Sequence, residues 1–169
     1  IKLVIAPTGS GKTSALISGA DRLVSGHKGY KVFFDLPARA LATQLGNNGA
    51  VRTIVGGDSF DEKSPLIATT YEKMYEVENH IQRQKVQGNT ERYVLVLDES
   101  HLLTTQHTFR QDAIKAVISC IERNDFYSIV LVTATPEPNS LYHFDEIVKF
   151  GSSSPVPSIN RLEIIEVDD

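Results

Sequence analysis

The first 13 residues read IKLVIAPTGSGKT, an apolar run that leads directly into a glycine-rich loop. Gly9 and Gly11 have no side chains, so the main chain can curl around a phosphate group and point its N–H groups at it. Lys12 can reach the β- and γ-phosphates, and Thr13 can offer its hydroxyl to Mg²⁺. The stretch therefore predicts a phosphate-binding loop between a strand and a helix, with a nucleoside triphosphate and Mg²⁺ as its ligands.

The general pattern for such loops has glycine at its first position, and here that position is Ala6. A plain Gly/Ser turn before a lysine is the alternative interpretation. A dinucleotide-binding loop is disfavoured because its third glycine would fall on Ser14. The residues expected to bind the nucleotide are Thr8, Gly9, Ser10, Gly11, Lys12, Thr13 and Ser14.

Length and composition indicate one globular domain. The chain has 169 residues, of which 41% are hydrophobic and 22% charged, enough to form a sizeable core. Its net charge of −4 disfavours a generic basic nucleic-acid-binding module, but allows a local surface that contacts phosphates. Cys120 is the single cysteine, so no internal disulfide can form, and its apolar helical surroundings indicate a core position.

Membrane and export signals are not evident in the sequence. No apolar run approaches the roughly 18 residues that a membrane-spanning helix needs, and no signal peptide is visible. The chain begins without methionine and inside an apolar run. We therefore expect a piece of a longer intracellular protein, cytoplasmic by default.

Short apolar runs alternate with helical patterns along the chain, which predicts an α/β fold with a mostly parallel central sheet and helices on both faces. We expect one domain over residues 1–150, with a Ser/Pro linker and a late strand over 151–169. The expected strands are 1–5, 30–35, 51–55, 66–69, 93–97, 128–132, 146–150 and 162–167, and the expected helices are 13–25, 38–45, 71–77 and 107–121.

Residues 78–92 are polar and have little periodicity, so we expect a loop or an exposed helical excursion there. The basic residues of this segment are interpreted as a solvated face, in preference to a nucleic-acid contact.

A second chemical signal lies at the end of the buried strand 93–97, where Asp98 and Glu99 are followed by Ser100 and His101. Ligands of parallel sheets bind beyond the carboxyl ends of the strands. Asp98 can hold Mg²⁺, which takes one or two carboxylates and keeps several waters. Glu99 is then placed to orient or deprotonate the attacking water. Capping of the following turn is the structural alternative for both residues.

Several motifs, in order along the chain, resemble the superfamily 2 helicases. The phosphate-binding loop with alanine at its first position is similar to their motif I. Asp98-Glu99-Ser100-His101 is similar to their DExH box, and Thr133-Ala134-Thr135-Pro136 to motif III. The segment 37–44 is similar to motif Ia, with Ala38 in place of threonine, and Gly56-Gly57 and 68–71 match the GG and Ib positions, with Tyr71 in place of proline.

The resemblance implies a first RecA-like domain of an ATP-driven nucleic-acid motor. It implies that Lys12, Asp98 and Glu99 are catalytic, and that Thr13 and Asp98 bind the metal. It also implies that His101, Thr133 and Thr135 couple nucleotide state to nucleic-acid binding. Arg39, Gly57 and Thr70 would contact the nucleic-acid backbone. Structural alternatives are a solvated charge for Arg39, a turn at Gly56-Gly57, and a helix N-cap for Thr70.

A second RecA-like domain would complete the ATP site in this family, and we expect it as a partner of this chain. The DExH-type box leans toward DNA or general nucleic-acid translocation. Two other functions stay open: a kinase or non-helicase ATPase with the same loop, and an ATP-gated binding module without turnover. The kinase alternative does not account for motifs Ia and III.

Overall fold

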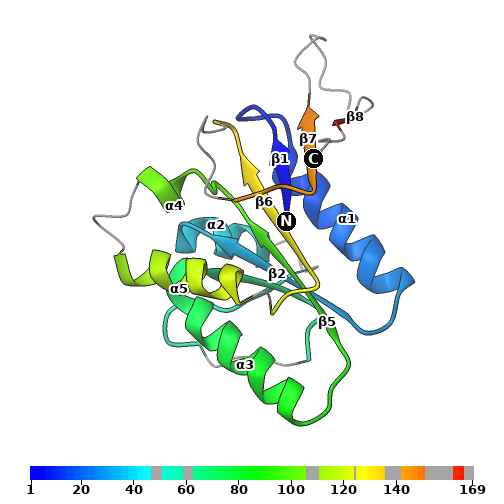
Figure 1. The fold of residues 1–169 in the computed structure, drawn as a ribbon, viewed down its shortest axis with the longest axis vertical. Coiled ribbons are helices and arrows are strands. Elements are labelled where there is room, and N and C mark those ends of the chain that lie inside the picture. The colour runs from blue at the N-terminus through cyan, green and yellow to red at the C-terminus, as the bar shows by residue number, and fades with distance from the viewer. Residues whose placement is uncertain are drawn as a thin grey trace.

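An eight-stranded sheet forms the centre of the computed structural model, in the order β3-β4-β2-β5-β6-β1-β7-β8 (Figure 1). The structure describes residues 1–46, 51–58, 63–105, 111–123, 125–135, 142–150 and 162–165. Paired strands are parallel, except that β8 runs antiparallel to β7. The strands are β1 (Lys2–Ile5), β2 (Tyr30–Leu36), β3 (Arg52–Thr53), β4 (Leu66–Thr70), β5 (Arg92–Leu97), β6 (Ser128–Thr133), β7 (Glu146–Phe150) and β8 (Leu162–Ile165).

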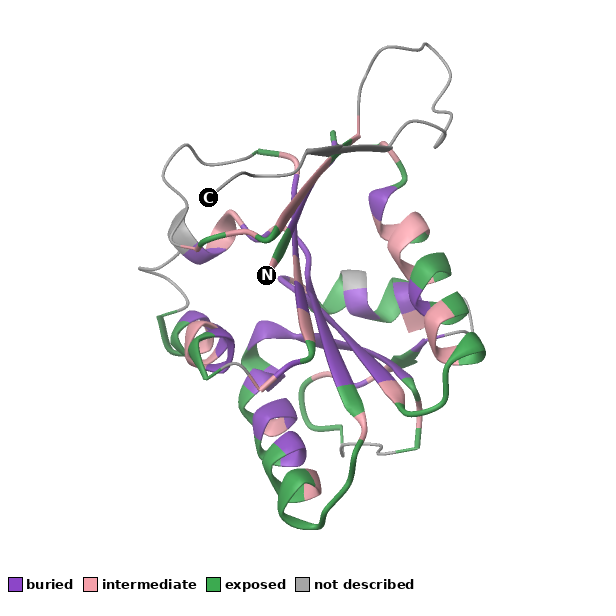
Figure 2. Cartoon of the chain, turned by 45° about the vertical axis from the view of Figure 1, so that its right-hand side comes forward, coloured by how far each residue is buried: buried purple, intermediate pink, exposed green. Residues whose placement is uncertain are grey.

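Helices cover both faces of the sheet, so its central strands are buried on both sides (Figure 2). Alternate residues of one strand enter different apolar layers: Phe33 packs in one, Phe34 in the other. The first layer contains side chains of α3, α4 and α5, and the second those of α1 and α2. The helices are α1 (Lys12–Gly26), α2 (Arg39–Gly46), the 3-10 turn η1 (Tyr71–Lys73), α3 (Met74–Val86), α4 (Leu102–Thr105) and α5 (Gln111–Glu122).

The predicted fold class and most of the predicted elements are confirmed. Cys120 lies in the core and is 1% exposed, as expected, and burial raises the pKa of its thiol to about 12. Its thiol therefore stays protonated and serves as an apolar group.

Of the two alternatives predicted for residues 78–92, the helical one is confirmed as far as Val86, but the predicted exposure is wrong at residues 78, 80 and 81. α3 continues to Val86, and His80 and Ile81 are 1% and 0% exposed. Met74, Val77 and Ile81 form a helical stripe against the sheet, and the polar residues between them hid its period. Arg83 and Lys85 are exposed, as expected of a solvated face.

Three further differences concern element bounds. The strand predicted over 51–55 is a two-residue pairing, β3, at the edge of the sheet. α4 was not predicted, because four residues are too few to show a helical period. The helix predicted over 107–121 is seen as α5, and residues 107–110 lie outside the described part, as does the linker 151–157.

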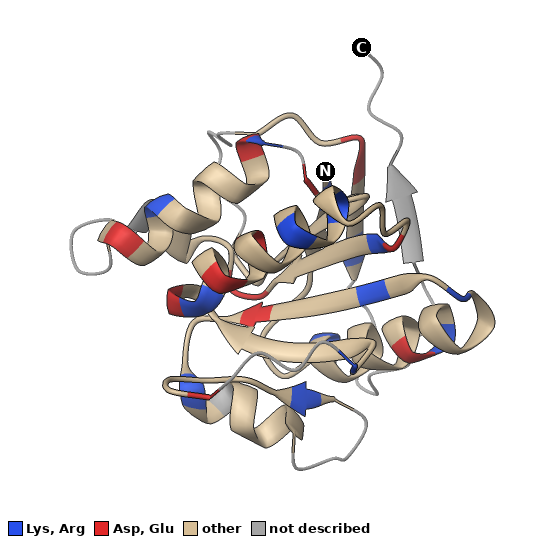
Figure 3. Ribbon diagram, turned by 90° about the horizontal axis from the view of Figure 1, so that it is seen from below, with Lys and Arg blue, Asp and Glu red and all other residues tan. Residues whose placement is uncertain are grey.

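Figure 3 shows that basic and acidic positions are interspersed along the ribbon. This mixture agrees with the modest net charge of −4. Within the residues that the structure describes, no helix has both the length and the apolar composition to cross a bilayer.

Candidate functional site

The predicted catalytic residues meet at the carboxyl edge of the sheet, where the parallel strands end. β1 and β5 both pair with β6, so the loops that follow these strands are neighbours. Ile5 pairs with Thr133, and Leu97 pairs with Leu131. The strand order thus brings together the loop after β1, the turn after β5 and the end of β6, although Ala6 and Thr133 stand at opposite ends of this stretch of sequence.

The phosphate-binding loop is anchored at its first residue. Ala6 is 0% exposed, and its N–H donates to the Thr133 carbonyl over 3.0 Å. Gly9 and Gly11 have φ of 77° and 78°, a left-handed conformation that glycine adopts without strain. A side chain at either position would meet no other atom within 4 Å, so it is the backbone conformation that requires glycine there.

One hydrogen bond and one ion pair join this loop to the turn after β5. The Thr13 hydroxyl donates to Asp98 Oδ2 over 3.3 Å. Lys12 Nζ lies 3.2 Å from Glu99 Oε1, and the lysine side chain is 9% exposed. The predicted nucleotide-binding and carboxylate motifs therefore form one site. Thr8 on the same loop and Ser14 in the first turn of α1 are exposed.

Asp98 is held at four of its atoms. Its N–H donates to the Asp35 carbonyl over 3.1 Å, and its own carbonyl accepts from the Tyr71 hydroxyl over 2.7 Å. Asp98 Oδ1 accepts from the Glu99 N–H over 3.0 Å, and Oδ2 accepts from Thr13. Burial raises the pKa of the Asp98 carboxyl, an effect that the Glu99 N–H and the Lys12 charge partly oppose. A metal cation at this carboxylate would favour its ionised form.

Glu99 has a φ of 52° and is the non-glycine residue with positive φ in the described part of the chain. A residue with a side chain adopts this conformation at a cost of about 1–3 kcal/mol, and such residues cluster at functional sites. Its carboxylate lies between Lys12 and His101, with His101 Nδ1 3.4 Å from Oε2. The turn thus aims the Glu99 side chain at the phosphate-binding loop.

The three predicted coupling residues form a chain of contacts beside this carboxylate. His101 Nδ1 lies 3.2 Å from the Thr133 hydroxyl oxygen. The same hydroxyl donates to the Thr135 carbonyl over 3.1 Å and accepts from the Thr135 N–H over 3.0 Å. Thr133 therefore connects the end of β6 to His101, and through His101 to Glu99. Pro136, also part of the predicted motif, lies outside the described residues.

The residues at this edge fit ATP and Mg²⁺ chemically. The Ser10 hydroxyl oxygen is buried and has no hydrogen-bond partner within the described part of the chain. Such a group calls for a polar partner, which a phosphate oxygen supplies. Thr13 and Asp98 offer a hydroxyl and a carboxylate oxygen, the ligands that Mg²⁺ prefers. Lys12 and the start of α1 add positive charge.

The residues predicted to contact nucleic acid follow other strands of the same edge. Arg39 and Gly57 are exposed, and the Arg39 guanidinium packs so closely on Gly56 that a β-carbon there would overlap it. Thr70 is 2% exposed and makes no side-chain cap at η1, so it offers mainly its backbone to a ligand. Arg39 and the glycine pair are therefore adjacent, and Thr70 ends the strand β4 between β2 and β3.

Two residues that support the site were not predicted from the sequence. Tyr71 was noted only for its departure from proline, and its hydroxyl bond to Asp98 depends on the order of the strands. Asp35 is 0% exposed, and its two carboxyl oxygens have no hydrogen-bond partner in the described residues. Burial raises the pKa of Asp35 well above its ordinary value, and the Glu72 charge adds to this rise. An acidic residue near the end of an apolar run was the available signal.

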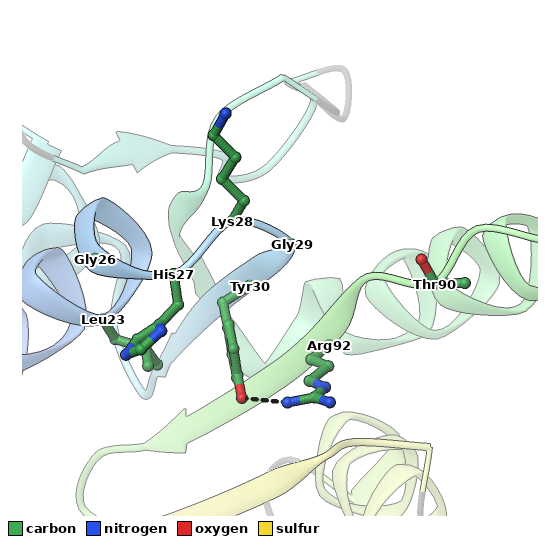
Figure 4. Close-up of a pocket in the computed structure, with 8 residues that line it drawn as sticks. All are labelled: Leu23, Gly26, His27, Lys28, Gly29, Tyr30, Thr90 and Arg92. Carbon is green, nitrogen blue, oxygen red and sulfur yellow. Dashed lines mark hydrogen bonds between the residues drawn. The ribbon is translucent and has the colours of Figure 1, made fainter.

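The opposite, amino edge of the sheet carries a different group of side chains. Arg92 lies over the rings of Tyr30 and Tyr127, 5.5 and 4.9 Å from their centroids. Its guanidinium donates to the Tyr30 hydroxyl over 2.8 Å (Figure 4). Tyr30 and Arg92 border a hollow of about 730 Å³ that Lys28 and Gly29 also line. None of the predicted catalytic or nucleotide-binding residues lines it.

Comparison with known proteins agrees with this geometry. The sequence model of the DEAD/DEAH box helicase family matches residues 2–144. An uncharacterized protein of Methanocaldococcus jannaschii, MJECL28, is 29% identical over 156 residues, which cover 84% of this chain and 12% of that protein.

Solved structures of helicases share the fold. The DUF1998 helicase MrfA bound to DNA and AMPPNP superimposes with a TM-score of 0.59 at 15% identity, over 80% of this chain and 22% of that chain. The Pyrococcus furiosus Hef helicase domain gives 0.52 at 19% identity, over 82% and 31%. The fold is thus the RecA-like α/β fold of helicase domains, and the family match over residues 2–144 places this chain in the DEAD/DEAH box helicase family.

Proposed function

We propose that this chain is the first ATP-binding domain of a motor that couples hydrolysis of Mg-ATP to movement on, or unwinding of, a nucleic acid. One observation carries the proposal: the Lys12–Glu99 and Thr13–Asp98 pairs, at 3.2 and 3.3 Å, join a phosphate-binding loop to two carboxylates at one sheet edge. A loop that only bound phosphate would have no use for the second carboxylate.

In this proposal the loop residues 8–14 hold the phosphates through main-chain N–H groups, the Ser10 hydroxyl and Lys12. Thr13 and Asp98 hold Mg²⁺, which when bound neutralises phosphate charge and orients the phosphates for attack. Glu99 orients the attacking water and accepts its proton at a carboxylate oxygen. Lys12 Nζ lies 3.2 Å from Glu99 Oε1, so the group proposed to bind phosphate and the proposed base face the same point of the site.

Nucleic acid as the partner is supported by the match to a helicase family and by relatives solved with DNA bound. Besides MrfA, the Type ISP restriction-modification enzyme LlaBIII bound to DNA superimposes over 99% of this chain with a TM-score of 0.54 at 16% identity. Arg39, Gly57 and Thr70 are the proposed contacts to the sugar-phosphate backbone. His101, Thr133 and Thr135 are proposed to relay the nucleotide state to them.

A second RecA-like domain is part of the proposal. This chain spans 12% of MJECL28 and 22% of MrfA, so it corresponds to a fraction of each of these proteins. An arginine supplied from outside the first domain raises turnover about 10³–10⁵-fold in phosphate-loop enzymes. Residues 1–169 alone should therefore bind nucleotide but hydrolyse it slowly, and fast polynucleotide-stimulated turnover by these residues alone would contradict this part.

The test is the ATPase rate of the full-length protein with and without single-stranded DNA, duplex DNA and RNA. We expect at least one polynucleotide to stimulate it. Glu99→Gln should lower the stimulated rate about 10²–10⁴-fold, the usual contribution of a general base. Glu91→Gln, an acid-to-amide change at the amino edge beside Lys31, should leave the rate unchanged. Phosphate transfer to a small acceptor, with no polynucleotide effect, would favour the kinase alternative.

A further inference from the structure

Tyr71 connects two parts of the carboxyl edge that are far apart in sequence. It follows β4 directly, is 1% exposed, and donates its hydroxyl to the Asp98 carbonyl over 2.7 Å. β4 and β5 are not neighbours, because β2 lies between them. The tyrosine side chain therefore spans the end of β2 to reach the turn that carries the two carboxylates.

The carbonyl that accepts this bond belongs to the peptide group between Asp98 and Glu99. The peptide group is planar, so its orientation is set by ψ of Asp98 and φ of Glu99. These two angles also set the direction in which both side chains leave the turn. The N–H of the same peptide group donates to Asp98 Oδ1 over 3.0 Å. The peptide is thus fixed at both its polar atoms while Glu99 is kept at a φ of 52°.

On its other side, the segment 70–73, which contains Tyr71, contacts the turn at Gly56-Gly57. Lys73, which is 6% exposed, donates to the Asp58 carbonyl over 3.2 Å and to Glu76 over 2.6 Å. Asp58 in turn closes the turn over Gly56 and Gly57: its N–H donates to the Val55 carbonyl over 3.1 Å, and its carboxylate accepts from the Val55 N–H over 3.0 Å. Within the segment 70–73, Lys73 therefore contacts the turn at Gly56-Gly57, and Tyr71 contacts Asp98.

Resting on the proposed function, we propose that Tyr71 is a positioning residue that holds the Asp98–Glu99 peptide in its working orientation and passes movement of the 70–73 segment to these carboxylates. The proline that is usual at this position in the family that the chain resembles has no hydroxyl and cannot make this bond. Tyr71 bonds to the main chain of Asp98 and therefore acts through Asp98 and Glu99.

The test compares Tyr71→Phe with Tyr93→Phe. Both tyrosines are buried in the same apolar layer, but the Tyr93 hydroxyl donates to Glu91 at the amino edge over 3.1 Å. Affinity for a fluorescent ATP analogue is measured with EDTA and with Mg²⁺, together with Tm, and kcat and KM for ATP are measured with and without polynucleotide.

In Tyr71→Phe, affinity in EDTA should stay within about 2-fold of wild type, because the phosphate-binding loop is intact. The affinity gained on adding Mg²⁺ should fall about 2- to 10-fold, the effect of one net hydrogen bond. The polynucleotide-stimulated kcat should fall by a similar factor. KM for ATP, measured with Mg²⁺ present, should rise in step with the lost Mg²⁺-dependent affinity. Tyr93→Phe should keep the full Mg²⁺ gain, and 3-fluorotyrosine at position 71, which retains the donor, should restore it.

Three results would overturn the proposal: a full Mg²⁺ gain in Tyr71→Phe, an equal loss in Tyr93→Phe, or a loss in EDTA as large as that with Mg²⁺, which indicates a purely structural role. If Tyr71→Phe lowers the Mg²⁺ gain but no polynucleotide stimulates the wild-type protein, the motor function fails while the positioning of Asp98 and Glu99 stands. If Tyr71→Phe does not fold, the same measurements are made with 4-fluorophenylalanine at position 71, which fills similar space but has no O–H donor. A reduced Mg²⁺ gain supports the proposal, and a full gain overturns it.

Discussion

The two edges of the sheet differ in how far several of their polar side chains are exposed to solvent. At the carboxyl edge, Lys12, Asp98 and Thr133 are 9%, 8% and 3% exposed. At the amino edge, Arg92 and Lys28 are exposed, and Tyr127 is 62% exposed. The hollow lies at the amino edge, whereas Glu99, with its positive φ, lies at the carboxyl edge. The buried oxygens of Ser10 and Asp35, which have no hydrogen-bond partner among the described residues, lie at or near that edge too.

The difference shows that a hollow alone does not identify a site. Burying polar groups without full hydrogen bonding costs free energy, and groups perturbed in this way cluster at functional sites. The Arg92 cluster, in contrast, is exposed and already paired with tyrosine rings and a hydroxyl.

The largest effect is expected from removing a lysine. Lys12→Ala should lower ATP hydrolysis by the full-length protein about 10²–10³-fold, the usual loss when one group that stabilises developing charge is removed. Lys28→Ala at the amino edge should leave the rate within error of wild type. Steady-state ATPase assays decide this, and equal losses in both variants would remove the distinction between the edges.

A pair of glycines gives a smaller and more selective effect. Gly11 and Gly29 both have positive φ, 78° and 87°, and both have open space where a β-carbon would lie. Alanine at either position should therefore destabilise the fold by a similar amount, about 1–2 kcal/mol, measured by urea unfolding.

Only Gly11→Ala should also weaken nucleotide binding, because its methyl group would enter the loop that receives the phosphates. Titration calorimetry on both variants checks this part. Weaker binding in Gly29→Ala, of the same size, would contradict it.

The smallest effect concerns pH and Asp35. Its pKa is raised in the folded state, so the folded protein holds a proton that the unfolded chain, with a pKa of about 3.9, releases. Stability should therefore fall as pH rises from about 4 toward the folded-state pKa. Asp35→Asn carries no titrating group, so its Tm relative to wild type should increase over that pH range. A Tm difference that is constant from pH 4 to 8 would show that Asp35 does not titrate with unfolding.

The sequence was sufficient for the parts of the site that are contiguous in the chain. The loop 6–13 and the turn 98–101 each contain their chemistry within a few residues, and the structure places both at the carboxyl edge. The Tyr71–Asp98 bond was not predictable, because it depends on β2 lying between β4 and β5. α3 was underestimated because its buried stripe is interrupted by polar residues that are themselves buried, such as Glu78 and His80.

The most direct test of the account is an NMR titration of the ¹⁵N-labelled 169-residue chain with Mg²⁺ and a non-hydrolysable ATP analogue. The account predicts that amide shifts concentrate at residues 9–14, 98–101 and 133–135, on the carboxyl edge. The amide chemical shifts of residues 27–30 and Arg92 should stay unchanged during the titration. Saturable shifts centred on Gly29, Tyr30 and Arg92, with the carboxyl edge unchanged, would contradict it.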